Sequence, residues 1–485
     1  MPSDSGRLTR RETLGLALAA TPLARAQSGN RPNIVYILAD DLGWGDLACY
    51  NPDTAIPMPN ANRLASEGMR FTDMHSSSAV CTPSRYSILT GRYCWRTRMK
   101  KSVLNGYSPN LIETGRLTVP AMLKSLGYYT AGVGKWHLGL GEEAKTDYAK
   151  PLRPGPNVHG FDYYFGIPAS LDMDPYVYFE NESTVEQPTS STPGSKDPRG
   201  VYWRPGAMAP SFDISQTLSV LASKAVDIVK TRAAQPKQPF FLYFPMTGPH
   251  TPWLPTKEFQ GKSKAGDYGD FVCQVDATIG RVLDALEQNG LAKNTLVILA
   301  SDNGADWKLE DQARFAHRAN ANWKGEKADI WEAGHRIPFI ARWPGRIRAN
   351  RVSNELGCLV DSMSTLAAVT GFSLPDNAAE DSFNLLPALL EENTKPIRQD
   401  VIHHSNDGVF SLRRGQWKLE EGLGSGGFSP PGNVEPAPGG PKGQLYDLAK
   451  DPGELNNLYQ KRLDIVDSMS TLLEKYKTQG HTRPL

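Results

Sequence analysis

The run Cys81-Thr82-Pro83-Ser84-Arg85 places a thiol and a guanidinium close together at an expected helix start. Proline is common in the first turn of a helix, and the unpaired N–H groups of that turn attract anions. A cysteine just ahead of such a turn is suited to chemistry on an anionic group. A lone cysteine is otherwise usually buried or disulfide-bonded, and that alternative stays open at this point.

Carboxylate and amide side chains follow two strongly apolar segments, residues 34–39 and 296–300. Neighbouring side chains on a strand point to opposite faces, so the first segment must end and turn for two adjacent aspartates to reach one ion. The glycines nearby permit that turn. Two such clusters favour an all-oxygen site for calcium or magnesium over solvated turns. The predicted ligands are Asp40, Asp41, Asp302 and Asn303.

Basic and titratable side chains follow other apolar segments. Lys135 and His137 come after residues 129–133, and they share a face if the extended backbone continues. Prolines on both sides of His250 fix its backbone after the run 240–244. A lone histidine is usually an ordinary loop residue, but two of only nine follow strands of one inferred sheet, which favours a functional role.

Short apolar runs alternate with helical stretches along most of the chain. This pattern predicts an α/β fold with a mostly parallel central sheet flanked by helices. Ligands of such sheets bind beyond the carboxyl ends of the strands, where the side chains above are expected. From about residue 396 the pattern changes to an antiparallel hairpin and a closing helix, which predicts a smaller C-terminal α+β subdomain with an antiparallel sheet. The main predicted strands are 34–39, 129–133, 240–244, 296–300 and 337–341, and the main predicted helices are 215–233, 270–288 and 463–476.

Length and charge narrow the function classes. A chain of 485 residues predicts one large unit and something smaller. Lys and Arg total 53 against 52 Asp and Glu, a net charge of +1, so no overall charge recruits nucleic acid or an anionic membrane. Five cysteines are too few and too scattered for a disulfide framework. The sequence past the N-terminus contains no candidate membrane span.

The N-terminus has the pattern of an export signal. Arg10 and Arg11 precede a short apolar run over 14–20, and Ala24-Arg25-Ala26 matches a small-x-small cleavage site. The arginine pair is similar to a twin-arginine signal, although Thr13 replaces the usual bulky apolar residue, so the general secretory route stays open. We expect export to a bacterial periplasm or secretion. The predicted domains are an export signal over 1–26, a catalytic domain over 30–395 and a C-terminal subdomain over 396–485.

The order of these motifs resembles that of the sulfatase family. The Asp-Asp turn, the cysteine run closed by Gly91-Arg92, and the segments 134–137, 248–250 and 302–304 follow the family order over roughly residues 33–342. The family places a lysine four residues before the aromatic of an aromatic-Glu-x-Gly segment, which matches Lys327 and not Lys324. The resemblance implies an alkaline-phosphatase-like fold and the hydrolysis of a sulfate ester.

The resemblance further implies that a formylglycine-generating or anaerobic sulfatase-maturating enzyme oxidises Cys81 to formylglycine. One oxygen of the hydrated aldehyde would attack sulfur to give a covalent sulfo-enzyme, and loss of a proton from the other hydroxyl would later expel sulfate. One Ca²⁺ ion would be held by the four predicted oxygen ligands and the modified Cys81. In this scheme Arg85 and Lys135 bind and orient the hydrate, and Lys327 and His250 contact the sulfate. One or both of the latter protonate the leaving group, and His137 removes the last proton.

Two other functions remain open on the sequence. One is a phosphoester hydrolase of the same superfamily, and the other is a catalytically inactive exported protein that binds sulfated glycans. The cysteine run favours sulfate, and the full set of lysines and histidines favours an enzyme. The expected partner is a sulfated small molecule or glycan, with carbohydrate and aryl sulfates both compatible, and the oligomeric state is open.

Residues 151–212 are rich in Pro, Gly and Ser and show little periodicity, which predicts long loops around the site. Such loops commonly set substrate choice. His403 and His404 precede the first strand of the C-terminal subdomain. They could face the mouth of the site, but a solvated strand end is the favoured interpretation. The rim residues that could touch substrate, although ordinary loop polarity explains them equally well, are Asp172, Asp174, Tyr176, Trp203 and Arg204.

Overall fold

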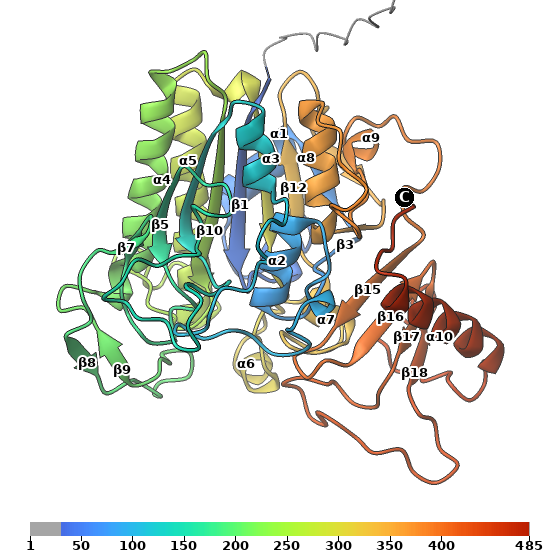
Figure 1. Cartoon of the computed structure of the whole chain (residues 1–485). Helices are drawn as coiled ribbons and strands as arrows, with labels where there is room; N and C mark the ends of the chain where they lie inside the picture. Colours follow the sequence, from blue (N-terminus) through green and yellow to red (C-terminus); the bar gives the residue numbers. More distant parts are fainter. Residues whose placement is uncertain (1–30, 485) are drawn as a thin grey trace, which may run out of the picture. The chain divides into compact units, whose positions relative to one another are not determined.

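A ten-stranded mixed sheet forms the centre of the described residues, 31–484, of the computed structural model (Figure 1). The predicted export signal lies outside the described residues. Across the sheet the strands are β13 (Arg351–Ser353), β2 (Met69–Phe71), β12 (Phe339–Arg342), β11 (Thr295–Ser301), β1 (Asn33–Asp40), β10 (Phe240–Pro249), β4 (Tyr129–Lys135), β5 (Tyr163–Ile167), β6 (Phe179–Glu180) and β7 (Ser183–Thr184).

The middle of this sheet is parallel. Strand β1 pairs in parallel with β10 and β11, and β4 pairs in parallel with β10 and β5. The predicted α/β class is therefore confirmed. Strand β12 was also predicted, but it runs antiparallel to β11, which makes the sheet mixed at that side.

Strand β1 is buried on both faces, and this explains its unbroken apolar sequence. Its alternate side chains enter two different hydrophobic clusters. Ile34, Tyr36 and Leu38 pack with helices α2 (Cys81–Thr90), α3 (Val119–Ser125) and α8 (Ser362–Thr370). Val35, Ile37 and Ala39 pack with α1 (Pro59–Glu67), α4 (Thr217–Ala233) and α5 (Gly266–Gln288), so helices cover both faces.

A separate antiparallel sheet follows near the C-terminus, as predicted. Its strands lie in the order β15 (Asp400–His404), β16 (Phe410–Arg414), β17 (Trp417–Glu420) and β18 (Gln444–Asp447). Helix α10 (Leu463–Thr478) packs against it through Val466, Met469 and Leu473, which share a hydrophobic cluster with Leu412 and Leu419.

The segment 151–212 is only partly the set of loops that was expected. It contains β5, which extends the parallel sheet, and the two-stranded sheet of β8 (Ser190–Thr192) and β9 (Gly206–Met208). The other short elements are β3 (Met74–His75), β14 (Gly357–Cys358), α6 (Leu309–Arg314), α7 (Glu332–His335) and α9 (Leu386–Leu389). Over the described range, no helix is both long and apolar enough to cross a membrane.

Candidate functional site

Two aspartates meet where β1 ends. Asp40 is the last residue of β1, and Asp41 takes a left-handed backbone conformation with φ of 64°. The predicted turn is therefore made by Asp41 itself, a short polar residue that tolerates this conformation. Gly43 instead permits close packing of two chain segments, because a Cβ there would lie 2.1 Å from the carbonyl oxygen of Ala319.

The end of β11 supplies the other predicted oxygen ligands. Asp302 Oδ1 accepts a hydrogen bond of 3.2 Å from the backbone N–H of Asp41. Asn303 Nδ2 donates to Asp41 Oδ1 at 2.7 Å, whereas the buried Asn303 Oδ1 has no hydrogen-bond partner within residues 31–484. An unpaired buried oxygen among three buried carboxylates is what a hard divalent cation requires, so these residues fit such an ion.

Cys81 begins α2 and faces this cluster. Its Sγ lies 3.7 Å from Asp40 Oδ1, and the side chain is buried. Burial raises the pKa of the Cys81 thiol to about 12, so an unmodified Cys81 is not a thiolate at neutral pH and is a poor nucleophile. All five cysteines, which lie in the described range, are free, so the disulfide-bonded alternative for Cys81 is wrong.

Arg85, which lies in α2, bonds to residues at the ends of β11 and β4. Its Nε and Nη2 donate to Asp302 Oδ2 at 3.0 and 2.7 Å, and its Nη1 donates to the carbonyl oxygen of Lys135 at 3.1 Å. The guanidinium is fully buried, so its charge acts in a low-dielectric environment.

Two lysines pair with the two aspartates of the turn. Lys135 Nζ lies 2.7 Å from Asp40 Oδ2, and Lys327 Nζ lies 2.7 Å from Asp41 Oδ2. Burial would raise the pKa of Asp40, but Lys135, His250 and Arg85 outweigh it and hold this pKa well below its usual range. Lys324 points elsewhere, because its ammonium lies 4.0 Å from the centre of the Trp331 ring.

His137 presents a proton acceptor to the site. Its Nε2 lies 2.7 Å from the carbonyl oxygen of Leu104, so this nitrogen carries the proton and donates it. The buried Nδ1 has no partner in the described part of the chain. Burial and nearby Lys135 hold the pKa of His137 well below its usual value, so the ring is neutral. The predicted extended geometry does not persist, since β4 ends at Lys135 and His137 has φ of 58°.

His250 and Ser170 lie next to Asp41 and Lys135, respectively. His250 Nδ1 donates to the carbonyl oxygen of Thr251 at 2.6 Å, which leaves Nε2 3.2 Å from Ser170 Oγ and 3.8 Å from Asp41 Oδ2. Ser170 also accepts a hydrogen bond of 3.2 Å from Lys135 Nζ. Ser170 belongs to no motif that the sequence displays. The available signal was the short apolar run of β5, whose end lies just before it.

A cavity of about 550 Å³ opens above these residues. Cys81, His137, His250 and Lys327 line it together with Ser170. Asp172 and Arg204, which pair with each other, also line it. The other predicted rim residues, Asp174, Tyr176 and Trp203, are not among its lining residues. Lining residues that no sequence motif indicated include Ser102, Arg199, Tyr202, Lys308, Asn406 and Phe428.

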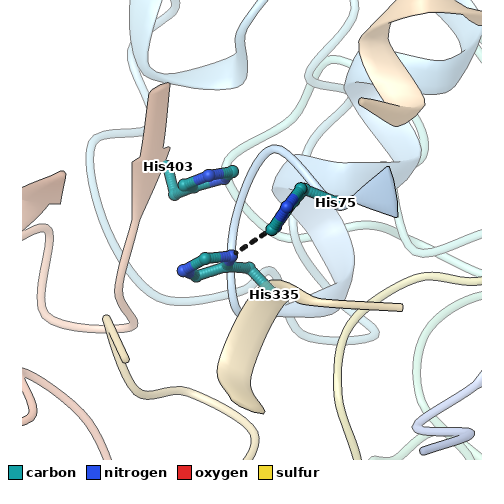
Figure 2. A group of neighbouring side chains, drawn as sticks. All are labelled: His75, His335 and His403. Carbon is teal, nitrogen blue, oxygen red and sulfur yellow. Dashed lines mark hydrogen bonds between the residues drawn. The ribbon is translucent and has the colours of Figure 1, made fainter. Parts of the chain in front are cut away.

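A cluster of three histidines lies outside the lining of this cavity (Figure 2). The ligating atoms of His75, His335 and His403 lie within 4.8 Å of one another, and all three side chains are buried. The rings of His335 and His403 stack with centroids 3.8 Å apart and planes 8° apart. Imidazole lone pairs lie in the ring plane, so stacked rings do not direct theirs to one ion, and we interpret the cluster as a packing contact. The prediction that His403 and His404 form a solvated strand end is wrong, since both are buried.

Comparisons with known proteins agree with this geometry. The Sulfatase family profile matches residues 32–372. The chain is 34% identical over 490 residues to an N-acetylgalactosamine-6-O-sulfatase of Bacteroides thetaiotaomicron, covering 93% of this chain and 94% of that protein. It is 34% identical over 473 residues to human arylsulfatase A, covering 92% of this chain and 86% of that protein.

A solved structure has a similar fold. It was described in connection with the metabolism of multiple glycosaminoglycans by Bacteroides thetaiotaomicron, and it aligns with a TM-score of 0.83 and 33% identity. The alignment covers 93% of this chain and all of that one, 100%. The chain therefore belongs to the sulfatase family and is a sulfuric ester hydrolase.

Proposed function

We propose that this enzyme removes sulfate from a carbohydrate, using a formylglycine made from Cys81 and one Ca²⁺ ion. The observation that carries the proposal is the convergence of three buried carboxylates and the unpaired Asn303 Oδ1 next to the Cys81 side chain. The N-acetylgalactosamine-6-O-sulfatase relative supports a sugar substrate, so a 6-O-sulfated N-acetylgalactosamine is the first substrate to test.

The protein would hold the ion through Asp40, Asp41, Asp302, Asn303 and the modified Cys81. A bound Ca²⁺ would polarise the sulfate oxygens and stabilise the negative charge near the attacking oxygen. A hydrated aldehyde at position 81 would supply one oxygen to attack sulfur and a second hydroxyl to expel the sulfate afterwards. The high pKa of the Cys81 thiol supports the need for this modification, because the unmodified side chain is a weak nucleophile.

The fixed positive charges would orient the reacting groups. Arg85 is held by Asp302 and Lys135 by Asp40, so both cations are placed before substrate arrives. Lys327 lines the cavity and would bind a sulfate oxygen. Preorganised cations of this kind stabilise charge that develops in the transition state without a reorganisation cost.

Two histidines would transfer protons, one when the ester bond breaks and the other when sulfate is released. His250 lines the cavity, and with its ring protonated on both nitrogens it would give the Nε2 proton to the oxygen of the departing alcohol when the ester S–O bond breaks, keeping the Nδ1 proton that bonds Thr251. His137 lines the same cavity, and its unpartnered Nδ1 would accept a proton from the remaining hydroxyl at position 81. The carbon–oxygen bond to sulfate would then break as the aldehyde reforms.

The remaining proposals concern maturation and organisation. We infer that a maturating enzyme oxidises Cys81 before folding buries it, and that the N-terminal segment directs export to the periplasm or medium. Residues 30–395 would form the catalytic domain, and residues 396–485 a subdomain that supports it.

Mass spectrometry of the tryptic peptide Phe71–Arg85, on protein from a host that makes formylglycine, tests the proposal directly. We expect an aldehyde at position 81 and sulfate release from a 6-O-sulfated N-acetylgalactosamine, both lost in Cys81→Ala. An unmodified thiol in fully active protein would overturn the mechanism. Phosphate release from the matching phosphate ester at a higher rate than sulfate release would favour phosphoester hydrolysis instead.

A further inference from the structure

A large aromatic side chain is exposed at the wall of the catalytic cavity. Phe428 lines the same cavity as Cys81 and is 49% exposed. It lies in the Gly- and Pro-rich loop between β17 and β18. An aromatic side chain that is half exposed and lines the catalytic cavity is available to contact a ligand bound there.

The loop holds Phe428 in a defined place. The backbone N–H groups of Phe428 and Ser429 both donate to Asp329 Oδ1, at 2.9 and 3.0 Å. Gly427 lies so close to the chain that a Cβ there would be 2.3 Å from the carbonyl oxygen of Ala328. Asp329 and Ala328 directly follow Lys327, so the ring is anchored to the segment that carries a predicted sulfate-binding group.

A polar side chain lines the cavity from the same part of the chain. Asn406 follows β15, and its backbone N–H donates to the carbonyl oxygen of Ala328 at 2.9 Å. Its carbonyl oxygen accepts a hydrogen bond of 2.7 Å from the backbone N–H of Ser102. These two bonds fix the backbone. The side-chain Nδ2 donates to Asp407 Oδ1 at 2.9 Å, which leaves its second N–H and the Oδ1 acceptor for a ligand.

We propose that Phe428 and Asn406 form a subsite for the pyranose ring of the substrate's leaving group. A pyranose has an apolar C–H face, which suits stacking on Phe428, and hydroxyl groups at its edge, which suit the amide of Asn406. This inference rests on the proposed carbohydrate sulfatase function and deepens it. It assigns recognition of the sugar to the C-terminal region and recognition of the sulfate to the ends of the central strands.

The first test separates binding from chemistry. In Phe428→Ala we expect KM for a 6-O-sulfated N-acetylgalactosamine oligosaccharide to rise about tenfold while kcat stays within about twofold. Phe428→Trp, which keeps a flat ring, should restore KM. Asn406→Ala should raise KM to a smaller extent. Val434→Ala is the matched control, because this loop residue is 41% exposed but does not line the cavity.

The second test does not need turnover. Saturation-transfer NMR with the desulfated N-acetylgalactosamine oligosaccharide should show contact with the sugar C–H groups in the wild-type protein and in Val434→Ala, and its loss in Phe428→Ala. Unchanged sugar contact and unchanged KM in Phe428→Ala would overturn the subsite. If the wild-type protein binds this sugar through Phe428 yet hydrolyses no sulfated sugar, the proposed function fails and the subsite stands.

Discussion

Ala79 donates its backbone N–H to the carbonyl oxygen of His404 across 3.0 Å. The bond joins the segment that leads into Cys81 to the last residue of β15, which is far away in the sequence. The same carbonyl oxygen accepts a second hydrogen bond, of 3.1 Å, from Ser78 Oγ. Ala328, next to Lys327, is held in turn by the N–H of Asn406. The C-terminal sheet therefore supports both segments that carry predicted catalytic groups.

Removing the Ser78 hydroxyl should weaken this support. Ser78→Ala takes away the buried hydrogen bond to His404, worth about 1 kcal/mol of unfolding free energy, and the longer one of 3.4 Å that Ser78 Oγ accepts from the N–H of Val80. We expect urea unfolding to show that loss together with a lower kcat. Ser66→Ala is the control, because the Ser66 hydroxyl also bonds a backbone carbonyl but lies on the surface. Equal effects of the two substitutions would contradict a special role for Ser78.

His404 should make the protein less stable in acid. Burial lowers the pKa of His404 from 6.5 to about 4, so the unfolded chain binds more protons than the folded protein between these pH values. Stability contributed by this site therefore falls as the pH drops from about 6.5 toward 4, by about 3 kcal/mol.

His404→Phe removes the titrating group and should flatten this part of the curve of unfolding free energy against pH. Urea unfolding at several pH values between 7 and 4 measures the slope. Ser66→Ala, which removes no titrating group, should leave the slope as in the wild-type protein. A His404→Phe protein with the wild-type slope would show that His404 is not the group responsible.

Much of the site could be predicted from the sequence because its reactive side chains come at or just after the ends of strongly apolar strands. The runs of β1, β4, β10 and β11 are mostly apolar, and the parallel pairing brings their carboxyl ends to one edge. Asp40, Lys135, His250 and Asp302 could therefore be grouped without coordinates.

What escaped prediction depends on contacts that no local pattern encodes. Ser170 follows β5, which is short and lies in a segment dominated by loop residues. Phe428 reaches the cavity only because Asp329, about a hundred positions earlier, holds its loop. His403 looks solvated by its position at a strand end, yet stacking on His335 buries it.

Calcium should stabilise the folded protein through Asn303. In the wild-type enzyme, calcium at about 100 times its Kd should add about 2.7 kcal/mol of stability and raise Tm. Asn303→Ala removes the unpaired Oδ1, so the rise should shrink. Asn303→Asp keeps an oxygen and should retain it. The exposed Asn322 provides the control, Asn322→Ala, with a wild-type response. An undiminished calcium response in Asn303→Ala would remove Asn303 from the ligand set.

His137 should matter for the end of the catalytic cycle rather than its beginning. The neutral ring lines the cavity, its Nε2 proton is donated to the carbonyl oxygen of Leu104, and its Nδ1 has no hydrogen-bond partner among residues 31–484. In His137→Ala we expect steady-state turnover to fall by about 10² to 10⁴, because a positioned base contributes that much. Rapid-quench measurements should still show one equivalent of desulfated alcohol released in a first burst, since attack on sulfur does not need this base.

Added imidazole should restore part of the lost turnover by acting as the missing acceptor. His159→Ala is the comparison, because His159 is a buried histidine that does not line the cavity, and it should show neither the burst nor the rescue. Loss of the first burst in His137→Ala would place this histidine in the attack step instead. Wild-type turnover in His137→Ala would remove it from the mechanism, and the base would have to be sought among the other cavity residues.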